Sequence, residues 1–150
     1  MSLENLLAIH RLQPFDATPG GVQRLLASAA RNLADARLTA LSADNRFDAA
    51  YKAIMQCAMI GLWAHGYRTA TSQPGHHQTA LQTLPRTMGV AQDIVIVLDV
   101  LRKQRNLNDY EGDPITDAAL GECLARAEAL LAHTRRWLQD HRPDLLAKDH

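Results

Sequence analysis

The apolar residues of this chain recur every three or four positions over segments much longer than an ordinary strand. In the clearest segment, which starts after Asp44 and extends to His65, this spacing gathers apolar side chains on one face of a helix. A second series, Met55, Met59 and Trp63, lies on another face of the same segment. A helix that is apolar on two faces is either central in its bundle or forms half of a dimer interface. The first face carries Phe47, Ala50, Tyr51, Ile54, Cys57, Ala58, Gly61, Leu62 and His65.

The same spacing predicts an all-α fold. Thr18 and Pro19 fit the start of one long helix, and Thr116 fits the start of the last, which Pro143 ends. The run 94–98 has strand composition, but its apolar stripe fits a helix, and a lone strand would have nothing to pair with. Residues 106–114 are rich in turn formers and predict a loop. Short helices are expected near residues 3–12 and 76–84, the latter interrupted by Pro85.

The sequence therefore predicts one domain, an up-and-down bundle of four main helices with short additional helices. Its core is expected over about residues 20–141, followed by a frayed tail at 142–150. Cys57 and Cys123 lie inside apolar helical patterns, so both are expected to be buried thiols.

Composition excludes several classes of protein. The chain carries 16 basic and 16 acidic residues, a balance that argues against an acidic tail and against a highly basic nucleic-acid coat protein. Its longest apolar run, Ile94–Leu98, is far shorter than the roughly 18 residues that span a bilayer. The first residues include an acid where a signal peptide has a positive start. We expect a cytoplasmic protein with no membrane partner.

Arg105 is the strongest candidate for a functional residue. Continuing the apolar stripe of Leu98 and Leu101 by four positions leads to this arginine, whose charge needs a partner when it faces inward. In one interpretation Arg105 caps the end of its helix and pairs with Asp109. In the other, its guanidinium faces inward to meet a phosphate or a nucleotide, and Arg102 adds positive potential.

Histidines are the other candidates. His76 and His77 are adjacent and cannot share one helix face, so they are poor joint ligands of a metal, and we expect neither a metal nor a cofactor. Either ring could face the Arg105 region instead. His65 ends the apolar stripe of its helix, which is typical of a half-buried histidine. The chain has no glycine-rich phosphate loop and no nucleophile elbow.

Three segments in order resemble the HEPN superfamily (higher eukaryotes and prokaryotes nucleotide-binding domain). They are the long helix FDAAYKAIMQCAMIGLWAHGYR, the segment GHHQTALQTL and the later helix ending RKQRNLNDY, and the resemblance covers roughly residues 20–140. It implies a four- or five-helix bundle of the kind common in prokaryotic defence and toxin–antitoxin loci. Active members of that superfamily are metal-independent ribonucleases that work as dimers, with an Arg, often a following Asn, and a His four to six residues beyond the Arg.

The motif is only partly present here. Arg105 and Asn106 match its start, but Asp109, Tyr110 and Glu111 occupy the positions where the histidine is expected. An aspartate titrates too low for proton transfer at neutral pH unless it is strongly desolvated. The resemblance therefore implies a degenerate member. In some toxin–antitoxin pairs a tyrosine near this motif receives a nucleotidyl group from a partner nucleotidyltransferase, and Tyr110 lies near that place.

Three functions stay open at this point. The first is a HEPN-like homodimer that binds a nucleotide or RNA without cleavage, as part of a toxin–antitoxin or defence system. The second is a protein–protein interaction module with no ligand site, whose contact surface is Met55, Met59 and Trp63. The third is a metal-independent endoribonuclease in which a histidine from elsewhere replaces the missing one. The candidate nucleotide- or RNA-binding residues are Arg105, Asn106, Asp109, Tyr110, Arg102, His76, His77 and His65.

Overall fold

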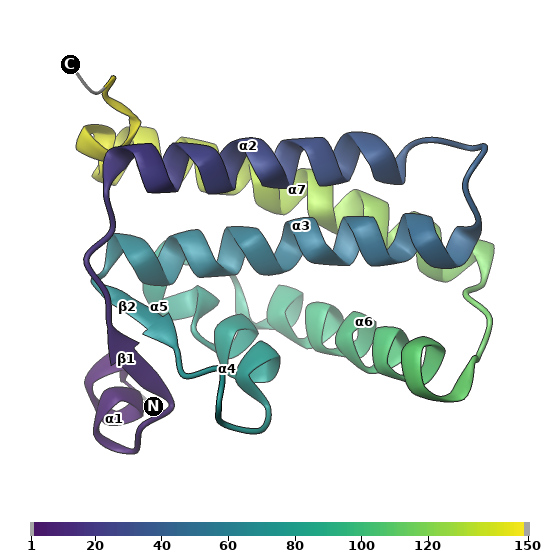
Figure 1. Ribbon diagram of the computed structural model, residues 1–150, viewed down its shortest axis with the longest axis horizontal. Coiled ribbons are helices and arrows are strands. Elements are labelled where there is room, and N and C mark those ends of the chain that lie inside the picture. Colours follow the sequence, from purple (N-terminus) through teal and green to yellow (C-terminus); the bar gives the residue numbers. More distant parts are fainter. Residues whose placement is uncertain (1, 149–150) are drawn as a thin grey trace.

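One long helix occupies the centre of the molecule. The computed structural model describes residues 2–148 and confirms a mostly helical chain (Figure 1). The central helix packs against every other long helix, and most of its side chains are buried. Successive long helices run in opposite directions (Figure 1). The four long helices are α2 (Pro19–Ala36), α3 (Ala43–Ala64), which is the central one, α6 (Gln92–Glu111) and α7 (Asp117–His141).

Hydroxyl side chains begin three of these helices. Thr18 Oγ1 accepts a hydrogen bond from the Gly21 amide at 3.0 Å at the start of α2, where Pro19 occupies the first turn. Ser42 caps α3 and Thr116 caps α7 in the same way, each at 3.1 Å. These bonds satisfy amides that have no partner inside the helix. The predicted starts at Thr18 and Thr116 are confirmed, whereas α3 begins at Ala43, before the expected start after Asp44.

The segments between the long helices differ from the prediction. Helix α1 (Leu3–Ala8) ends before Leu12. A short strand β1 (Leu12–Pro14) pairs antiparallel with β2 (Tyr67–Thr69), which follows the end of α3, so the chain is not entirely helical. Three-residue strands are too short to show an alternating pattern in the sequence. Pro85 does not interrupt a helix but stands in the first turn of α5 (Leu84–Met88), where a missing amide hydrogen costs little. Helix α4 (His76–Gln82) precedes it.

Helix α6 is longer than expected. The turn-forming residues after Arg105 continue the helix to Glu111, and the helix ends at Gly112, whose φ of +72° is the left-handed conformation that glycine adopts without strain. Asn108 supports this end, because its side-chain amide donates to the Asp113 carbonyl at 2.8 Å. The extra length keeps Arg105 and Asp109 one turn apart on the same face.

The C-terminal segment is packed rather than frayed. Residues Pro143–Leu146 form a 3₁₀ turn, η1, and Leu145 is 2% exposed in a small core cluster with Val22 and Leu138. Gln23 Nε2 donates to the carbonyls of Leu145 and Ala147 at 3.2 and 2.7 Å. Buried side chains also come from the N-terminal segment before residue 20. Residues 149 and 150 of the expected tail lie outside the described residues.

Both cysteines are buried and free, as predicted. Burial raises the pKa of Cys57 to about 11 and that of Cys123 to about 12, so neither is a reactive thiolate at neutral pH. None of the helices within residues 2–148 has the length and apolar content needed to cross a bilayer.

Candidate functional site

Arg105 lies on the face of α6 that turns toward α3. Its side chain is only 27% exposed. The guanidinium carbon lies 5.5 Å from the centre of the Tyr51 ring, which belongs to α3 and is 2% exposed. The positively charged group therefore rests on an aromatic ring at the edge of the core, a favourable contact for a cation. The inward direction of Arg105 follows from its place four positions after Leu101 on the buried stripe of α6.

Two carboxylates approach Arg105 from different helices. Asp109 Oδ2, one turn further along α6, lies 2.9 Å from Arg105 Nε, and Asp48 Oδ1 of α3 lies 3.6 Å from the same nitrogen. The predicted ion pair with Asp109 is confirmed. The Arg105 Nε atom nevertheless makes no hydrogen bond although it is buried, because its N–H is not directed at either carboxylate oxygen. The two carboxylates thus offset the charge of Arg105 without a well-directed hydrogen bond at this nitrogen.

His77, at the start of α4, contacts the hydroxyl group of Tyr51. Its Nδ1 atom lies 3.3 Å from the Tyr51 hydroxyl, and the two ring centres are 6.0 Å apart. Burial lowers the pKa of His77, and the nearby His76, Arg105 and Arg102 lower it further, so the ring is neutral at pH 7. Neutral Nδ1 can accept the hydrogen bond from Tyr51. Arg105 and His77, 28 positions apart in the sequence, thus meet through one tyrosine.

A cavity of about 470 Å³ opens between these side chains. We call it the Arg105 cavity. Lys52 and Asp48 add one charge of each sign to its wall, and Met55 and Met59 supply an apolar surface. Its lining residues come from α2, α3, α4 and α6: Leu25, Asp48, Tyr51, Lys52, Met55, Gln56, Met59, His77 and Arg105.

Gln56 lines the cavity and links α3 to α2 by hydrogen bonds. It is 9% exposed, its Nε2 donates to Ser28 Oγ at 2.9 Å, and its Oε1 accepts from Asn32 Nδ2 at 2.8 Å. Both partners belong to α2, so the amide ties α2 to α3 beside the cavity. A buried amide with both ends satisfied orders its surroundings.

Tyr51 stays protonated in this setting. Burial raises the pKa of its hydroxyl to about 12, even though the positive charges of Arg105 and Arg102 act to lower it. The hydroxyl is therefore a permanent donor at neutral pH, and the charged groups that can meet an anion in the cavity are Arg105 and Lys52.

The other predicted residues of this region lie around the cavity rather than in it. Arg102 is held by Asp99 at 2.8 Å, one turn before Arg105. The His76 ring contacts the His77 ring edge-on, with 4.6 Å between their centres. Asn106 is half-buried and does not line the cavity. Tyr110 is 82% exposed on the outer face of α6.

His65 does not belong to this site. It is the residue after the last turn of α3, and its Nε2 atom donates to the Thr87 carbonyl at 2.8 Å. Its ring also lies 5.6 Å, centre to centre, from that of Trp137. These contacts give His65 a structural role in holding α5 against the end of α3.

The three residues predicted as a contact surface differ in their surroundings within the chain, and Met59 and Trp63 are half-buried. Met55 is 7% exposed, and Met55 and Met59 line the Arg105 cavity. Trp63 packs against Phe15, with ring centres 4.8 Å apart, near the other end of α3. The second apolar face of α3 thus packs mostly against other parts of the same chain. This agrees with a helix that is central in its bundle.

Sequence reasoning identified Arg105 and named His77 among several histidines, but it missed Asp48, Lys52 and Gln56. Tyr51 carried a usable signal, because a buried tyrosine needs a partner for its hydroxyl. No group of three or more His, Cys, Asp or Glu side chains among residues 2–148 is placed to hold a metal ion. Searches for a matching protein-family model, a similar curated protein or a similar solved structure gave no match.

Proposed function

We propose that this chain is a divergent HEPN-like protein that binds a nucleotide or RNA in the Arg105 cavity without cleaving it. The observation that carries the proposal is the position of the Arg105 side chain, which is 27% exposed and lines a cavity large enough for a small ligand. A phosphate oxygen is the acceptor that best matches a planar guanidinium.

The walls of the cavity suit the two parts of a nucleotide. A phosphate beside Arg105 would also meet Lys52, and the base or ribose would lie against Met55 and Met59. Asp48 opposes an anion here, since its carboxylate lies 3.6 Å from Arg105 Nε and already offsets part of the positive charge. The proposal therefore predicts that Asp48→Asn binds a phosphate ligand more tightly than the wild type.

Binding is measured by calorimetric titration with the four ribonucleoside 5′-monophosphates and a short single-stranded RNA. We expect Arg105→Ala to weaken binding about tenfold or more, because a charge-assisted hydrogen bond is lost. Arg126→Ala is the matched control. Arg126 pairs with Glu122 four residues away at 2.8 Å, as Arg105 pairs with Asp109, but it lies outside the Arg105 cavity.

No saturable binding by any of these probes, or equal affinity in the wild type and Arg105→Ala, would contradict the proposal. Either result would favour the interaction module without a ligand site. Unchanged affinity in Asp48→Asn would show that the bound group near Arg105 is not an anion.

A metal-independent endoribonuclease is the second candidate, and the position of His77 favours it. A neutral imidazole near a guanidinium supplies a proton acceptor and a phosphate contact, the two groups that 2′-hydroxyl attack on a phosphate needs. RNA incubated with the protein and a chelator should then be cleaved, and His77→Asn and Arg105→Ala should each abolish cleavage. Intact RNA after long incubation would contradict the endoribonuclease and leave the first candidate, a protein that binds RNA without cleaving it.

We propose a homodimer as part of the same function. The outer face of α6 carries Ile96, Val100 and Leu107, which are 59%, 48% and 44% exposed and recur at helical spacing. A second copy that covered this stripe would remove apolar area from water. Light scattering should give twice the mass of one chain, and Leu107→Glu should give the mass of one. A single-chain mass for the wild type contradicts the dimer.

The biological setting that we propose is a prokaryotic toxin–antitoxin or defence system. The partner would be a nucleotidyltransferase that joins the α-phosphorus of a nucleoside triphosphate to the Tyr110 hydroxyl oxygen and releases pyrophosphate and the hydroxyl proton. The exposure of this side chain in the single chain supports access by such an enzyme, which would act before a second copy covers the neighbouring Leu107. Incubation of the two proteins with a labelled nucleoside triphosphate would label the wild type but not Tyr110→Phe.

A further inference from the structure

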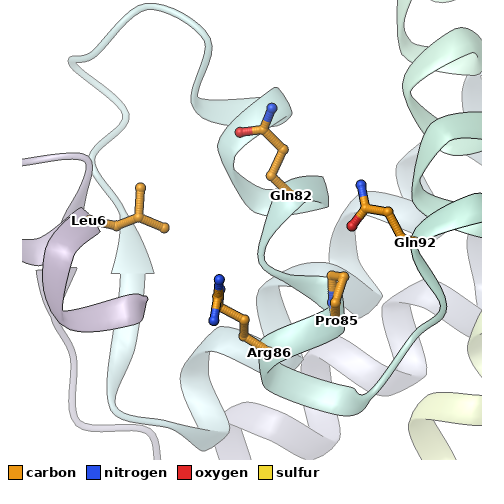
Figure 2. A pocket seen from close by; sticks show the side chains of 5 residues that line it. All are labelled: Leu6, Gln82, Pro85, Arg86 and Gln92. Carbon is orange, nitrogen blue, oxygen red and sulfur yellow. The ribbon is translucent and has the colours of Figure 1, made fainter. Parts of the chain in front are cut away.

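A second cavity lies between the N-terminal helix and the short helices that precede α6. Its volume is about 680 Å³, and its lining residues are Leu6 of α1, Gln82 of α4, Pro85 and Arg86 of α5, and Gln92 of α6. Figure 2 shows Leu6 on one side, with Gln82, Pro85 and Gln92 on the opposite side and the Arg86 guanidinium extended toward Leu6. The volume lies within the usual range of small-molecule sites.

The polar side chains of this cavity have no partners within the described part of the chain. Gln82, Arg86 and Gln92 are all exposed, so their polar atoms face solvent. Arg86 forms no ion pair, and none of the three side chains hydrogen-bonds with any of residues 2–148. No acidic side chain lines the cavity, so Arg86 is its one charged lining group. Most other arginines near a cavity here are already held by a carboxylate, as Arg105 is by Asp109.

The end of α6 adds to the positive potential. Gln92 is the first residue of this 20-residue helix, and the preceding Ala91 has no side-chain oxygen to cap it. The positive end of the helix dipole therefore lies beside the cavity. Asp93 offsets part of this potential, since its carboxylate accepts from the Ile94 amide at 3.0 Å. The charge of Arg86 is the main attraction for an anion.

We propose that this cavity is a binding site for a small molecule with one anionic group, a carboxylate or a phosphate, joined to a compact apolar body. Arg86 binds the anionic group, since its planar fork matches either oxyanion. Gln82 and Gln92 donate to or accept from neighbouring polar atoms of the ligand. Leu6, which is 7% exposed, and Pro85 form the apolar contact.

This site is separate from the Arg105 cavity. The two cavities share no lining residue, although α4 contributes His77 to one and Gln82 to the other. The inference does not depend on the proposed nucleotide site, and either can fail alone.

Four probes separate the features of the ligand. Phenyl phosphate and benzoate carry the same apolar ring with different anionic groups, whereas inorganic phosphate and acetate carry the anionic group alone. Titrations monitored by NMR would measure the dissociation constant of each probe. We expect at least one ring-bearing probe to bind more tightly than its ring-free counterpart. Comparing the dissociation constants of phenyl phosphate and benzoate should then show whether the site prefers a phosphate or a carboxylate.

Variants test the role of Arg86. We expect Arg86→Ala to weaken the best probe about tenfold or more, because a charged hydrogen-bond donor is lost. Arg24→Ala is the control, an exposed arginine on α2 outside this cavity. Arg105→Ala should leave the affinity unchanged. Arg86 is exposed, so its removal should not unfold the chain, and circular dichroism checks this. No saturable binding by any probe, or equal affinity in wild type and Arg86→Ala, overturns the proposal.

Discussion

Replacing Phe47 with alanine should lower the free energy of unfolding by about 3–5 kcal/mol, the range for a large aromatic side chain removed from a closed core. The ring is 1% exposed and belongs to the main core cluster, which also draws side chains from α2, α6 and α7. The neighbouring helices can close only part of the space that the ring leaves. Urea denaturation of wild type and variant measures the loss.

Phe47→Leu is the matched control for this prediction. It keeps an apolar side chain and removes fewer core atoms, so we expect a loss of about 1–2 kcal/mol. Equal stability of Phe47→Ala and the wild type would mean that α3 is not the packed centre of the fold. It would also undermine the site, because Asp48 and Tyr51 are positioned by the same turn of α3.

Alanine at Gly61 should destabilise the fold by about 1–3 kcal/mol, the usual cost of overpacking a core. An added Cβ would lie 2.8 Å from Thr87 Oγ1, 3.2 Å from Thr87 Cβ and 3.3 Å from Met88 Cε. Thr87 is 2% exposed and has little room to move. The glycine is therefore required for the close approach of α5 to α3. Thermal and urea denaturation measure the change.

Gly121 provides a control with the opposite expected sign. It also lies in a long helix, but an added Cβ there would meet nothing within 4 Å. Gly121→Ala should stabilise the chain by about 0.5–1 kcal/mol through helix propensity alone. The double variant Gly61→Ala/Thr87→Ala should recover part of the loss, since it removes the clashing hydroxyl. Stabilisation by Gly61→Ala alone would refute the close contact between α3 and α5.

Most of the helical fold could be predicted from the sequence because its signals are local. The three-to-four spacing marks long helices over several turns, and Thr18 and Thr116 fit cap positions whatever surrounds them. The small sheet could not be predicted in this way. Residues 12–14 and 67–69 become strands only because the end of α3 brings them side by side.

The residues at which helices end were harder to predict than the presence of the helices. Asn106, Asn108 and Asp109 are common in turns, yet the structure keeps them helical because Arg105 pairs with Asp109 along the helix and Gly112 supplies the stop. Leu145 looked like part of a frayed end, but it is buried against α2 and α7, and its contact with α2 joins segments more than a hundred residues apart.

The candidate site was predictable only in part for the same reason. Arg105 could be placed on an inward face because helical periodicity fixes its direction. The approach of His77 to Tyr51 depends on the path of the chain between α3 and α4, which no local pattern records. The Met55, Met59 and Trp63 stripe was correctly placed on a second face of α3, but the sequence could not show that Met55 is covered by the chain itself.

The proposed nucleotide site requires that Arg105 binds a phosphate group, and the Nε–H resonance of this side chain reports on that contact. The resonance would be assigned in ¹⁵N-labelled protein by its loss in Arg105→Lys and followed during titration with adenosine 5′-monophosphate and short RNA. We expect it to shift and saturate as a phosphate group binds to the guanidinium, while the Arg126 resonance stays in place. An Arg105 resonance that does not move at saturating ligand would contradict the account.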